Sequence, residues 1–552
     1  MGYIEKYNEW KEKVTDKVLK EELEKMEGNT EAIENAFYKD LEFGTGGMRG
    51  VLGVGTNCLN IYNIRKVTEG VSRYMVDKGL ESAAISYDSR INSKLFAHTA
   101  AAVFASHGIK VYIVADVSPT PFLSFAVRKL NCGMGVMVTA SHNPKKYNGY
   151  KLYNSTGCQI LDDEAYEVVS YVEKVDPFEV KPKDEKVYIK QGLINVMESW
   201  VYGSFLNSVE AQSLNDVEKL KIVYTPLNGA GYKLVPSVLY ERGFDDITIV
   251  PEQAKPNGNF TTCPYPNPEK PEALKLALKI AKEIDADIVL ATDPDCDRVG
   301  AAVKHRGEFV LITGNEMGVL LADYILGTKH VRWNLPQNGI IVTTIVSTPM
   351  AEKIADRFNI ETRKVLTGFK WIGDQMNKLD AEGELDRFIL GFEESYGYLA
   401  GGHARDKDAV VASMLICEMT SVYLKQGKTL VDQLAELHKI YGKYENKNIS
   451  KAFEGVTGAA KMQEILANLR KKPLKKLAGG TIVKFIDYMN QNEQPIPKSN
   501  VLSYETDNGL SIIIRPSGTE PLCKFYMTAS AGEKENKTLF AAAEADLDKI
   551  FG

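Results

Sequence analysis

Short apolar runs that end abruptly at polar turns recur along the chain, and a helical stretch usually follows each run. Runs of this length between turn residues are typical of buried strands. The segment 271–284 has helical spacing and opens on Pro271, which suits a first helical turn. This alternation of strands and helices predicts α/β layers. The predicted strand-and-turn segments span 83–90, 110–117, 135–144, 220–231, 246–252, 286–298, 339–349 and 387–397.

The two ends of the chain depart from this pattern. Residues 5–40 are charged with helical spacing, which predicts a peripheral helical arm, and the glycine-rich L-E-F-G-T-G-G-M-R-G after it is interpreted as a turn. Near the C-terminus, the strand-turn-helix units become sparse. The polar segments 446–450 and 489–495 are expected to be exposed connections. One face of the arm would carry Tyr7, Trp10, Val14, Val18 and Leu19.

The pattern predicts an α/β protein with several domains. At roughly one domain per 100–200 residues, a chain of 552 residues has room for three to five. We expect three similar α/β domains with mixed sheets between helices, followed by a C-terminal α+β domain. The expected limits are 1–208 with the helical arm, 209–326, 327–445 and 446–552.

Composition narrows the class of protein. The net charge of −6 argues against general nucleic-acid binding, which needs a basic face. Seven scattered cysteines without a C-x-x-C pair indicate reduced thiols and a cytoplasmic protein. The N-terminus has no apolar signal core, and no apolar run reaches the length of a membrane span, so no membrane partner is expected.

The stretch A-T-D-P-D-C-D-R carries the clearest chemistry. Asp293, Asp295 and Asp297 alternate just after a predicted buried strand, and alternate positions can face one side. Three converging carboxylates repel one another unless a cation lies among them, and oxygen ligands suit Mg²⁺. Cys296 would point away, and the adjacent Arg298 favours a site over a solvated acidic turn.

Ser141 follows another predicted strand, in V-M-V-T-A-S-H-N-P. It lies at the edge where open α/β sheets place their ligands. The glycines of a G-x-S-x-G elbow are absent, which disfavours a hydrolase triad. Pro144 would suit the first turn of a helix, which would make Ser141 a helix cap. From this stretch alone, Ser141 can be a nucleophile, a helix cap or a turn residue. His142 beside it is weak support, whereas Lys151 can supply positive charge or a proton.

Three further stretches can bind a ligand, although a plain turn would also explain the first and a capping or strand-end role the second. R-P-S-G-T-E-P combines a guanidinium, hydroxyls and flexible backbone amides, which together can bind a phosphate. In G-F-E-E-S-Y-G, Glu393 and Ser395 can reach a polyhydroxyl ligand. In H-A-R-D-K-D, Arg405 and Lys407 can add positive charge to a cleft, and Asp408 can cap the next helix. Arg49 on a flexible loop and Lys370 after a strand are weaker candidates.

Together these stretches resemble the α-D-phosphohexomutase superfamily over almost the whole chain. T-A-S-H-N-P is similar to its phosphoserine loop, D-P-D-C-D-R to its metal loop, G-F-E-E-S-Y-G to its sugar-binding loop and R-P-S-G-T-E-P to its phosphate-binding loop. All four occur in the family order. G-T-G-G-M-R-G and G-F-E-E-S-Y-G are similar to the longer bacterial phosphoglucomutase type, and so to animal phosphopentomutases and glucose-1,6-bisphosphate synthases. T-P-L-N-G-A-G departs from the family's T-P-L-H-G-x-G, because Asn228 replaces histidine.

The resemblance implies four domains around a central cleft, in which Ser141 carries a phosphate. It implies Mg²⁺ held by the three aspartates and a phosphoserine oxygen. Arg49 and Lys151 match positions near the transferred phosphoryl group, and Lys407 and His142 are further catalytic candidates. The implied substrate-binding residues are Glu393, Ser395, Arg298, Lys370, His403, Arg515, Ser517, Gly518 and Thr519.

The expected reaction is the interconversion of glucose 1-phosphate and glucose 6-phosphate through phospho-Ser141. Glucose 1,6-bisphosphate would be both intermediate and activator, and Lys151, Lys407 and His142 are candidates for the general base. Alternatives are a phosphomannomutase, a phosphopentomutase, a sugar-bisphosphate synthase, a Ser-His hydrolase and a non-catalytic phosphosugar-binding protein. A phosphosugar would be the partner of a monomer or weak homo-oligomer.

Overall fold

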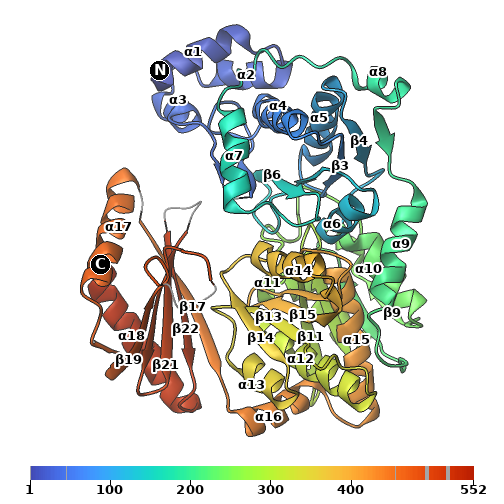
Figure 1. Ribbon diagram of the computed structural model, residues 1–552, viewed down its shortest axis with the longest axis vertical. Helices are drawn as coiled ribbons and strands as arrows, with labels where there is room; N and C mark the ends of the chain where they lie inside the picture. The colour runs from blue at the N-terminus through green and yellow to red at the C-terminus, as the bar shows by residue number, and fades with distance from the viewer. Residues whose placement is uncertain (1, 45, 454, 492–495, 518–521) are drawn as a thin grey trace. The chain divides into compact units, whose positions relative to one another are not determined.

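A computed structural model describes residues 2–44, 46–453, 455–491, 496–517 and 522–552 (Figure 1). The chain forms two compact units. The first contains Met1–Met317 and Phe369–Leu430, and the second contains Gly318–Gly368 and Val431–Gly552.

The N-terminal arm consists of three helices, α1 (Tyr3–Lys13), α2 (Lys17–Lys25) and α3 (Thr30–Phe37). Asp16 caps α2 by accepting the Leu19 N–H at 3.0 Å. Because α2 starts anew at Lys17, the helical period restarts there, and the expectation for Val18 is wrong. Its side chain is 64% exposed, whereas the other four predicted apolar residues of the arm are buried.

A seven-stranded mixed sheet follows, in the order β1-β2-β6-β5-β3-β4-β7. β3, β4, β5 and β7 run parallel, and β6, β2 and β1 add antiparallel at one edge. The strands are β1 (Phe43–Gly44), β2 (Gly47–Val51), β3 (Ser82–Tyr87), β4 (Lys110–Ile113), β5 (Met134–Val138), β6 (Tyr147–Asn154) and β7 (Ile194–Val196). The helices are α4 (Ile61–Asp77), α5 (Ser93–Ser106), α6 (Thr120–Lys129), α7 (Asp162–Val172), α8 (Glu185–Lys190) and α9 (Ser199–Glu210).

The glycine-rich stretch expected to be a turn is mostly β1 and β2. Gly47 has a φ of 148°, and a Cβ there would lie 2.2 Å from the Tyr150 carbonyl oxygen. Glycine therefore lets β2 approach β6 closely. Arg49 consequently extends from a strand and not, as expected, from a flexible loop.

The first unit contains a second sheet, in the order β12-β11-β10-β8-β9. β8, β9 and β10 are parallel, and β11 and β12 are antiparallel. The strands are β8 (Ile222–Thr225), β9 (Ile247–Ile249), β10 (Ile288–Thr292), β11 (Val299–His305) and β12 (Glu308–Ile312). The accompanying helices are α10 (Gly231–Glu241), the short η1 (Pro251–Gln253) and α11 (Pro271–Glu283), and α12 (Gly314–Val331) runs from the first unit into the second.

The rest of the first unit is the segment Phe369–Leu430. It contains α14 (Lys370–Ala381), η2 (Leu385–Arg387), the antiparallel pair β15 (Phe388–Glu393) and β16 (Gly397–Ala400), and α15 (Ala409–Lys425).

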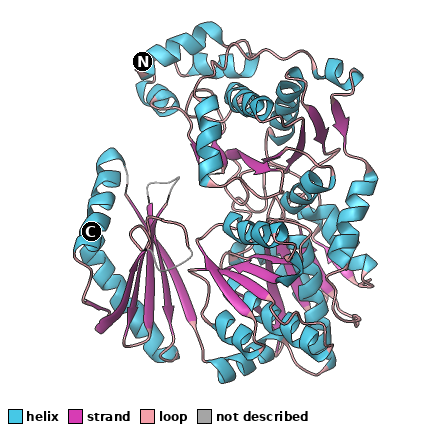
Figure 2. Ribbon diagram, in the orientation of Figure 1, coloured by secondary structure: helices cyan, strands magenta, loops and turns pink. Residues whose placement is uncertain are grey.

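The second unit contains the parallel pair β13 and β14 and a six-stranded antiparallel sheet, β17-β22-β21-β20-β19-β18. Helices α17 and α18 pack on this sheet through a shared apolar core (Figure 2). The elements are β13 (Ile340–Thr344), α13 (Met350–Arg357), β14 (Glu361–Val365), α16 (Leu430–Tyr441), β17 (Glu445–Ala452), α17 (Gly455–Lys471), β18 (Lys476–Leu477), β19 (Gly480–Asp487), β20 (Leu502–Thr506), β21 (Leu510–Pro516), β22 (Leu522–Ala529) and α18 (Glu533–Phe551).

Residues 446–450, expected to be an exposed connection, lie within β17. This strand forms the edge of the sheet and pairs with β22 over its whole length. Edge strands commonly carry polar residues that discourage further pairing, which explains the loop-like composition of the segment. In the other segment expected to be a connection, residues 492–495 lie outside the described residues.

All seven cysteines are free thiols, and only Cys58 is partly exposed. Burial raises the pKa of the Cys58 and Cys263 thiols to about 11, and that of Cys132 and Cys523 to about 12. Within the described ranges, no helix combines the length and the apolar character that a membrane crossing requires.

Candidate active site

Ser141 lies three residues beyond the end of β5, at the carboxyl edge of the parallel strands. Its backbone is left-handed, with a φ of 52°, and its N–H donates to Thr139 Oγ1 at 2.7 Å. The chain then turns through Pro144 directly into β6. Since no helix begins here, the helix-cap interpretation of Ser141 is wrong.

The hydroxyl of Ser141 contacts two other side chains. It donates to Asp293 Oδ2 at 2.9 Å, and its oxygen lies 3.2 Å from Nδ1 of His142. The fold thus brings the serine to the first of the three aspartates, 152 positions further along the chain. His142, which sequence alone ranked as weak support, is thus also within hydrogen-bond distance of the Ser141 hydroxyl.

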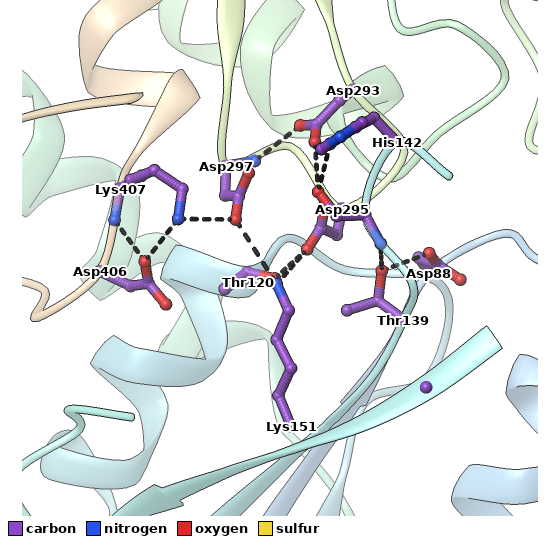
Figure 3. A network of polar contacts seen from close by, with 12 residues as sticks. Asp88, Thr120, Thr139, His142, Lys151, Asp293, Asp295, Asp297, Asp406 and Lys407 are labelled. Carbon is purple, nitrogen blue, oxygen red and sulfur yellow. Dashed lines mark hydrogen bonds and ion pairs between the residues drawn. The ribbon is translucent and has the colours of Figure 1, made fainter. Parts of the chain in front are cut away.

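The three aspartates lie in the loop between β10 and β11 and converge (Figure 3). One carboxylate oxygen from each lies within 4.8 Å of the others, and all three residues are at most 1% exposed. Cys296, with a φ of 52°, lies between the last two aspartates and is itself buried.

Donors hold both carboxylate oxygens of Asp293 and one oxygen each of Asp295 and Asp297. Asp293 Oδ1 accepts the N–H groups of Asp297 at 3.1 Å and Arg298 at 3.0 Å. Asp295 Oδ2 accepts from two side chains, both at 2.9 Å. Asp297 Oδ2 faces the ammonium groups of Lys407 at 3.1 Å and Lys151 at 3.5 Å.

The remaining oxygens fit a divalent cation. Oδ1 of Asp295 and Oδ1 of Asp297 are buried and have no hydrogen-bond partner. Burial and the two neighbouring carboxylates raise the pKa of Asp293 well above its usual range. Buried carboxylate oxygens without donors are costly unless a cation coordinates them, and an all-oxygen set suits a hard ion. The cluster can therefore bind a metal.

Two lysines flank the aspartates. Lys151 extends from β6 and lies 2.9 Å from Asp295, and Lys407 contacts Asp297 and, at 3.2 Å, Asp406. Burial opposes the charge of each lysine, but the carboxylates outweigh it and raise the pKa of both above the ordinary value. Both groups therefore stay cationic beside the cluster.

Lys407 reaches the aspartates past the hairpin of β15 and β16. A Cβ at Gly397 would lie 2.1 Å from Lys407 Cδ, so the missing side chain makes room for the lysine stem. Glu393, the last residue of β15, is buried. Burial opposes the charges of Lys407 and Arg298, but carboxylates raise the pKa of both, chiefly Asp297 for Lys407 and Glu269 for Arg298, with a smaller contribution from Glu393. Ser395 lies in the turn of this hairpin.

The stretch H-A-R-D-K-D mainly builds local structure. Asp408 accepts the N–H groups of Val410 and Val411 at 2.7 and 3.2 Å, which confirms its predicted role as the cap of α15. Its other oxygen lies 2.7 Å from His403 Nε2. The Arg405 side chain is fully buried and donates to Asp380 at 2.7 Å, so its predicted contribution of charge to a cleft is wrong.

The other candidates have defined partners. Arg49 donates to Asn143 Oδ1 at 3.2 Å, and Lys370 donates to Asp162 at 2.6 Å. Arg298 donates to Glu269 at 2.7 Å. In the second unit, Arg515 lies on β21. Ser517 follows that strand and donates its N–H to the Leu522 carbonyl at 2.8 Å, whereas Gly518 and Thr519 lie outside the described residues.

Sequence reasoning missed Arg90, whose side chain is fully buried behind the Ser141 loop. Its guanidinium binds four backbone carbonyls of that loop and packs 5.1 Å from the Phe260 ring. Asp88, 3.3 Å from Arg90, accepts the Thr139 hydroxyl at 2.6 Å. The only signal was the position of both residues after a predicted strand that ends at the same edge as Ser141.

Asn228 supports the metal loop through its backbone segment. Its φ is 57°, a left-handed conformation that asparagine tolerates, and its amide donates to the Lys255 carbonyl at 2.9 Å. Two residues later, the Ala230 N–H donates to the Pro294 carbonyl at 2.8 Å. The stretch T-P-L-N-G-A-G thus stabilises the aspartate loop through a backbone hydrogen bond.

Comparisons with known proteins place this chain in a family. Models of the phosphoglucomutase/phosphomannomutase alpha/beta/alpha domains I, II and III match residues 40–178, 202–307 and 313–441, and the model of the C-terminal domain matches 440–546. A phosphoglucomutase from Staphylococcus haemolyticus is 36% identical over 517 residues, which cover 91% of this chain and 92% of that protein. One from Staphylococcus saprophyticus is 33% identical over 536 residues, covering 94% and 95%.

The fold is also that of solved relatives. A phosphoglucomutase/phosphomannomutase family protein from Burkholderia thailandensis matches with a TM-score of 0.68 at 18% identity, covering 92% of this chain and 97% of that one. The four matched domains and the relatives along the whole chain show that this protein belongs to the phosphoglucomutase/phosphomannomutase family.

Proposed function

We propose that the protein is a phosphoglucomutase that interconverts glucose 1-phosphate and glucose 6-phosphate through a phosphoserine and glucose 1,6-bisphosphate. One observation carries the proposal: the Ser141 hydroxyl is bonded to the buried aspartate cluster, with two lysines beside it. The similarity to proteins named phosphoglucomutase supports glucose as the preferred sugar.

Ser141 is the phosphoryl carrier in this proposal. Phospho-Ser141 gives its phosphoryl group to the free hydroxyl of the sugar phosphate. A general base removes the proton of that hydroxyl, and the Ser141 oxygen leaves and takes up a proton. The resulting bisphosphate turns around and returns its other phosphoryl group. In the return step the Ser141 hydroxyl loses its proton. Two acceptors lie within reach of that proton in the structure, Asp293 Oδ2 and His142 Nδ1.

Asp293, Asp295 and Asp297, together with a phosphoserine oxygen, would hold Mg²⁺. The bound ion would supply Lewis-acid stabilisation of charge on the phosphoryl oxygens. Lys151 and Lys407 contact the carboxylates of Asp295 and Asp297 and would add positive charge near the transferring group, which lowers the barrier electrostatically. Arg49, which donates to Asn143 in the Ser141 loop, would add a third cation.

The rest of the proposed site recognises the substrate. Glu393 and Ser395 would accept and donate hydrogen bonds to sugar hydroxyls, with Arg298, Lys370 and His403 as further contacts. Arg515, Ser517, Gly518 and Thr519 would bind the phosphate that is not being transferred. A phosphate cradle accepts either end of the sugar, because it recognises the phosphate and not one sugar face.

We further propose the domain limits 1–208, 209–326, 327–445 and 446–552, a monomer or weak homo-oligomer, and glucose 1,6-bisphosphate as the activator. The free buried thiols suit a reducing compartment such as the cytoplasm.

Three measurements test the proposal. The intact mass of the purified protein should show a phosphate that peptide mapping places on Ser141, and Ser141→Ala should remove both the phosphate and mutase turnover. Full turnover by Ser141→Ala would refute the phosphoserine route.

In addition, kcat/KM should be compared for glucose, mannose, ribose and glucosamine 1-phosphates, with and without glucose 1,6-bisphosphate. A preference for mannose or ribose would identify a phosphomannomutase or phosphopentomutase. Net bisphosphate formation would indicate a synthase, an acyl-Ser141 without phosphate would indicate a hydrolase, and binding without turnover a phosphosugar-binding protein.

A further inference from the structure

Thr120 contacts one of the three aspartates of the site, Asp295. Asp295 Oδ2 accepts from Thr120 Oγ1 and from Lys151 Nζ, each at 2.9 Å, whereas Oδ1 is buried without a hydrogen-bond partner. A carboxylate can rotate about its terminal bond. Two donors on the same oxygen remove that freedom and leave the other oxygen without a donor.

The threonine is itself rigidly placed. It is the first residue of α6, fully buried, and lies between Pro119 and Pro121. Its own N–H donates to the Asp295 carbonyl oxygen at 2.9 Å, so the backbone and the side chain grip the same residue. A β-branched side chain has few χ1 choices, so the direction of the hydroxyl is largely set before any ligand binds.

The two donors to Asp295 differ in one respect. The Lys151 ammonium orients the carboxylate but also neutralises it, which weakens its attraction for a cation. The Thr120 hydroxyl orients the carboxylate and leaves its charge intact. Both donors belong to the part of the chain that forms the seven-stranded sheet, whereas Asp295 follows β10 of the other sheet. The aspartate loop thus depends on its neighbour for the orientation of one ligand.

We propose that Thr120 is a positioning residue for the cation of this site: its hydroxyl fixes Asp295 so that Oδ1 is ready to coordinate. The inference rests on the proposed metal-dependent function. Outer hydrogen bonds to metal ligands typically contribute 10–100-fold to metal affinity. We expect a loss of that size in the affinity for Mg²⁺ when the hydroxyl is removed, with a smaller effect on turnover once the metal is saturating.

The test compares Thr120→Val, which keeps the shape and removes the hydroxyl, with Thr120→Ser, which keeps the hydroxyl. The dissociation constant of Mg²⁺ for the full chain is measured by titration calorimetry. The Mg²⁺ concentration that gives half-maximal turnover is measured separately. Thr120→Val should raise both values 10–100-fold, and Thr120→Ser should leave them within about threefold of the unmodified protein. Equal Mg²⁺ affinity in Thr120→Val and the unmodified protein would overturn the proposal.

Thr68→Val provides the matched control. Thr68 is also a fully buried helical threonine, and its hydroxyl donates to the Ile64 carbonyl at 2.8 Å, in α4. This variant should lose stability without losing Mg²⁺ affinity, and an equal loss in both valine variants would count against the proposal. If Thr120→Val does not fold, Thr120→Ala replaces it. Mutase turnover of the unmodified protein in the same assay tests the proposed function independently.

Discussion

Arg90 shows how one buried side chain can set the geometry of a reactive residue that it does not face. Its five donors lie in a rigid plane, so a single group can bind several carbonyl oxygens of the Ser141 loop and the Asp88 carboxylate together. A left-handed serine costs conformational energy unless its surroundings enforce that backbone. Here the carbonyl oxygens bound by Arg90 and the Thr139 hydroxyl enforce it.

We predict that Arg90→Met lowers the free energy of unfolding by about 3–5 kcal/mol, because it strands a buried carboxylate and several carbonyls. Turnover should fall at least about 100-fold, since a shift of roughly 1 Å in the serine is enough for such a loss. Urea denaturation and kcat measure the two effects.

The variant Arg90→Lys separates the effect of the positive charge from the effect of the planar guanidinium. A lysine keeps the charge beside Asp88 but cannot span the carbonyl oxygens, so its kcat should stay close to that of Arg90→Met while its stability is intermediate. A lysine variant with full turnover would show that the planar fork is not required.

The residue scale also shows the limits of sequence. The convergence of the aspartates and the family were predictable, since alternation after a strand and four ordered motifs carry that information, and the matched family models confirm the family. Arg90 and Thr120 were not, because a charged residue in a turn and a threonine between prolines suggest exposed, ordinary positions. Their importance comes from partners 51 and 175 positions away.

At the scale of elements, the α/β class was predictable and the polar strands were not. Apolar runs identified β3, β5, β8 and β10, because each is buried throughout or nearly so. β2 and β17 were interpreted as a turn and a connection, since glycines dominate the first and exposed polar residues the second. Pairing with a neighbouring strand stabilises both, and a local pattern cannot show a pairing partner.

The hairpin of β15 and β16 gives the second prediction. Gly397→Ala should displace the Lys407 stem and break its 3.1 Å contact with Asp297, lowering kcat about 10–1,000-fold. Because the substitution separates a buried ion pair, it should also lower the free energy of unfolding. The control is Gly203→Ala on α9, where a Cβ meets no atom within 4 Å; it should retain turnover and gain up to about 1 kcal/mol.

The Lys407→Ala background checks the cause. If Gly397→Ala acts only through Lys407, adding it to Lys407→Ala should lower kcat no further. An additional loss in the double variant would mean that the alanine disturbs the hairpin itself.

At the scale of the whole molecule, the compact units do not follow chain order. Residues 318–368 belong with the C-terminal sheet, whereas 369–430 belong with the N-terminal sheets. A linear hydrophobic pattern shows consecutive blocks and carries no information on such long-range packing. The aspartates and Ser141 all lie in the first unit, so a bound cation should stabilise that unit.

The third prediction follows from this location. Mg²⁺ at about 100 times its Kd should raise the free energy of unfolding of the first unit by about 2.7 kcal/mol over its value in EDTA. The reason is that only the folded loop brings the metal ligands together. The intrinsic fluorescence of the four tryptophans can follow urea unfolding, because Trp10, which is 2% exposed, Trp200 and Trp371 lie in that unit. Asp293→Asn should abolish the gain; an equal gain in this variant would place the stabilising ion elsewhere.

The rates at which the buried thiols react can report on local opening of the protein. Each raised pKa leaves almost no thiolate at neutral pH, and burial blocks access, so maleimide should label the native chain slowly. Labelling then waits for local opening, and peptide mass spectrometry can time each site. Cys132 reports on the seven-stranded sheet, Cys263 on the five-stranded one and Cys523 on the C-terminal one. Without a single introduced probe, the order of labelling would reveal which part of the molecule opens first, and whether a sugar phosphate delays it.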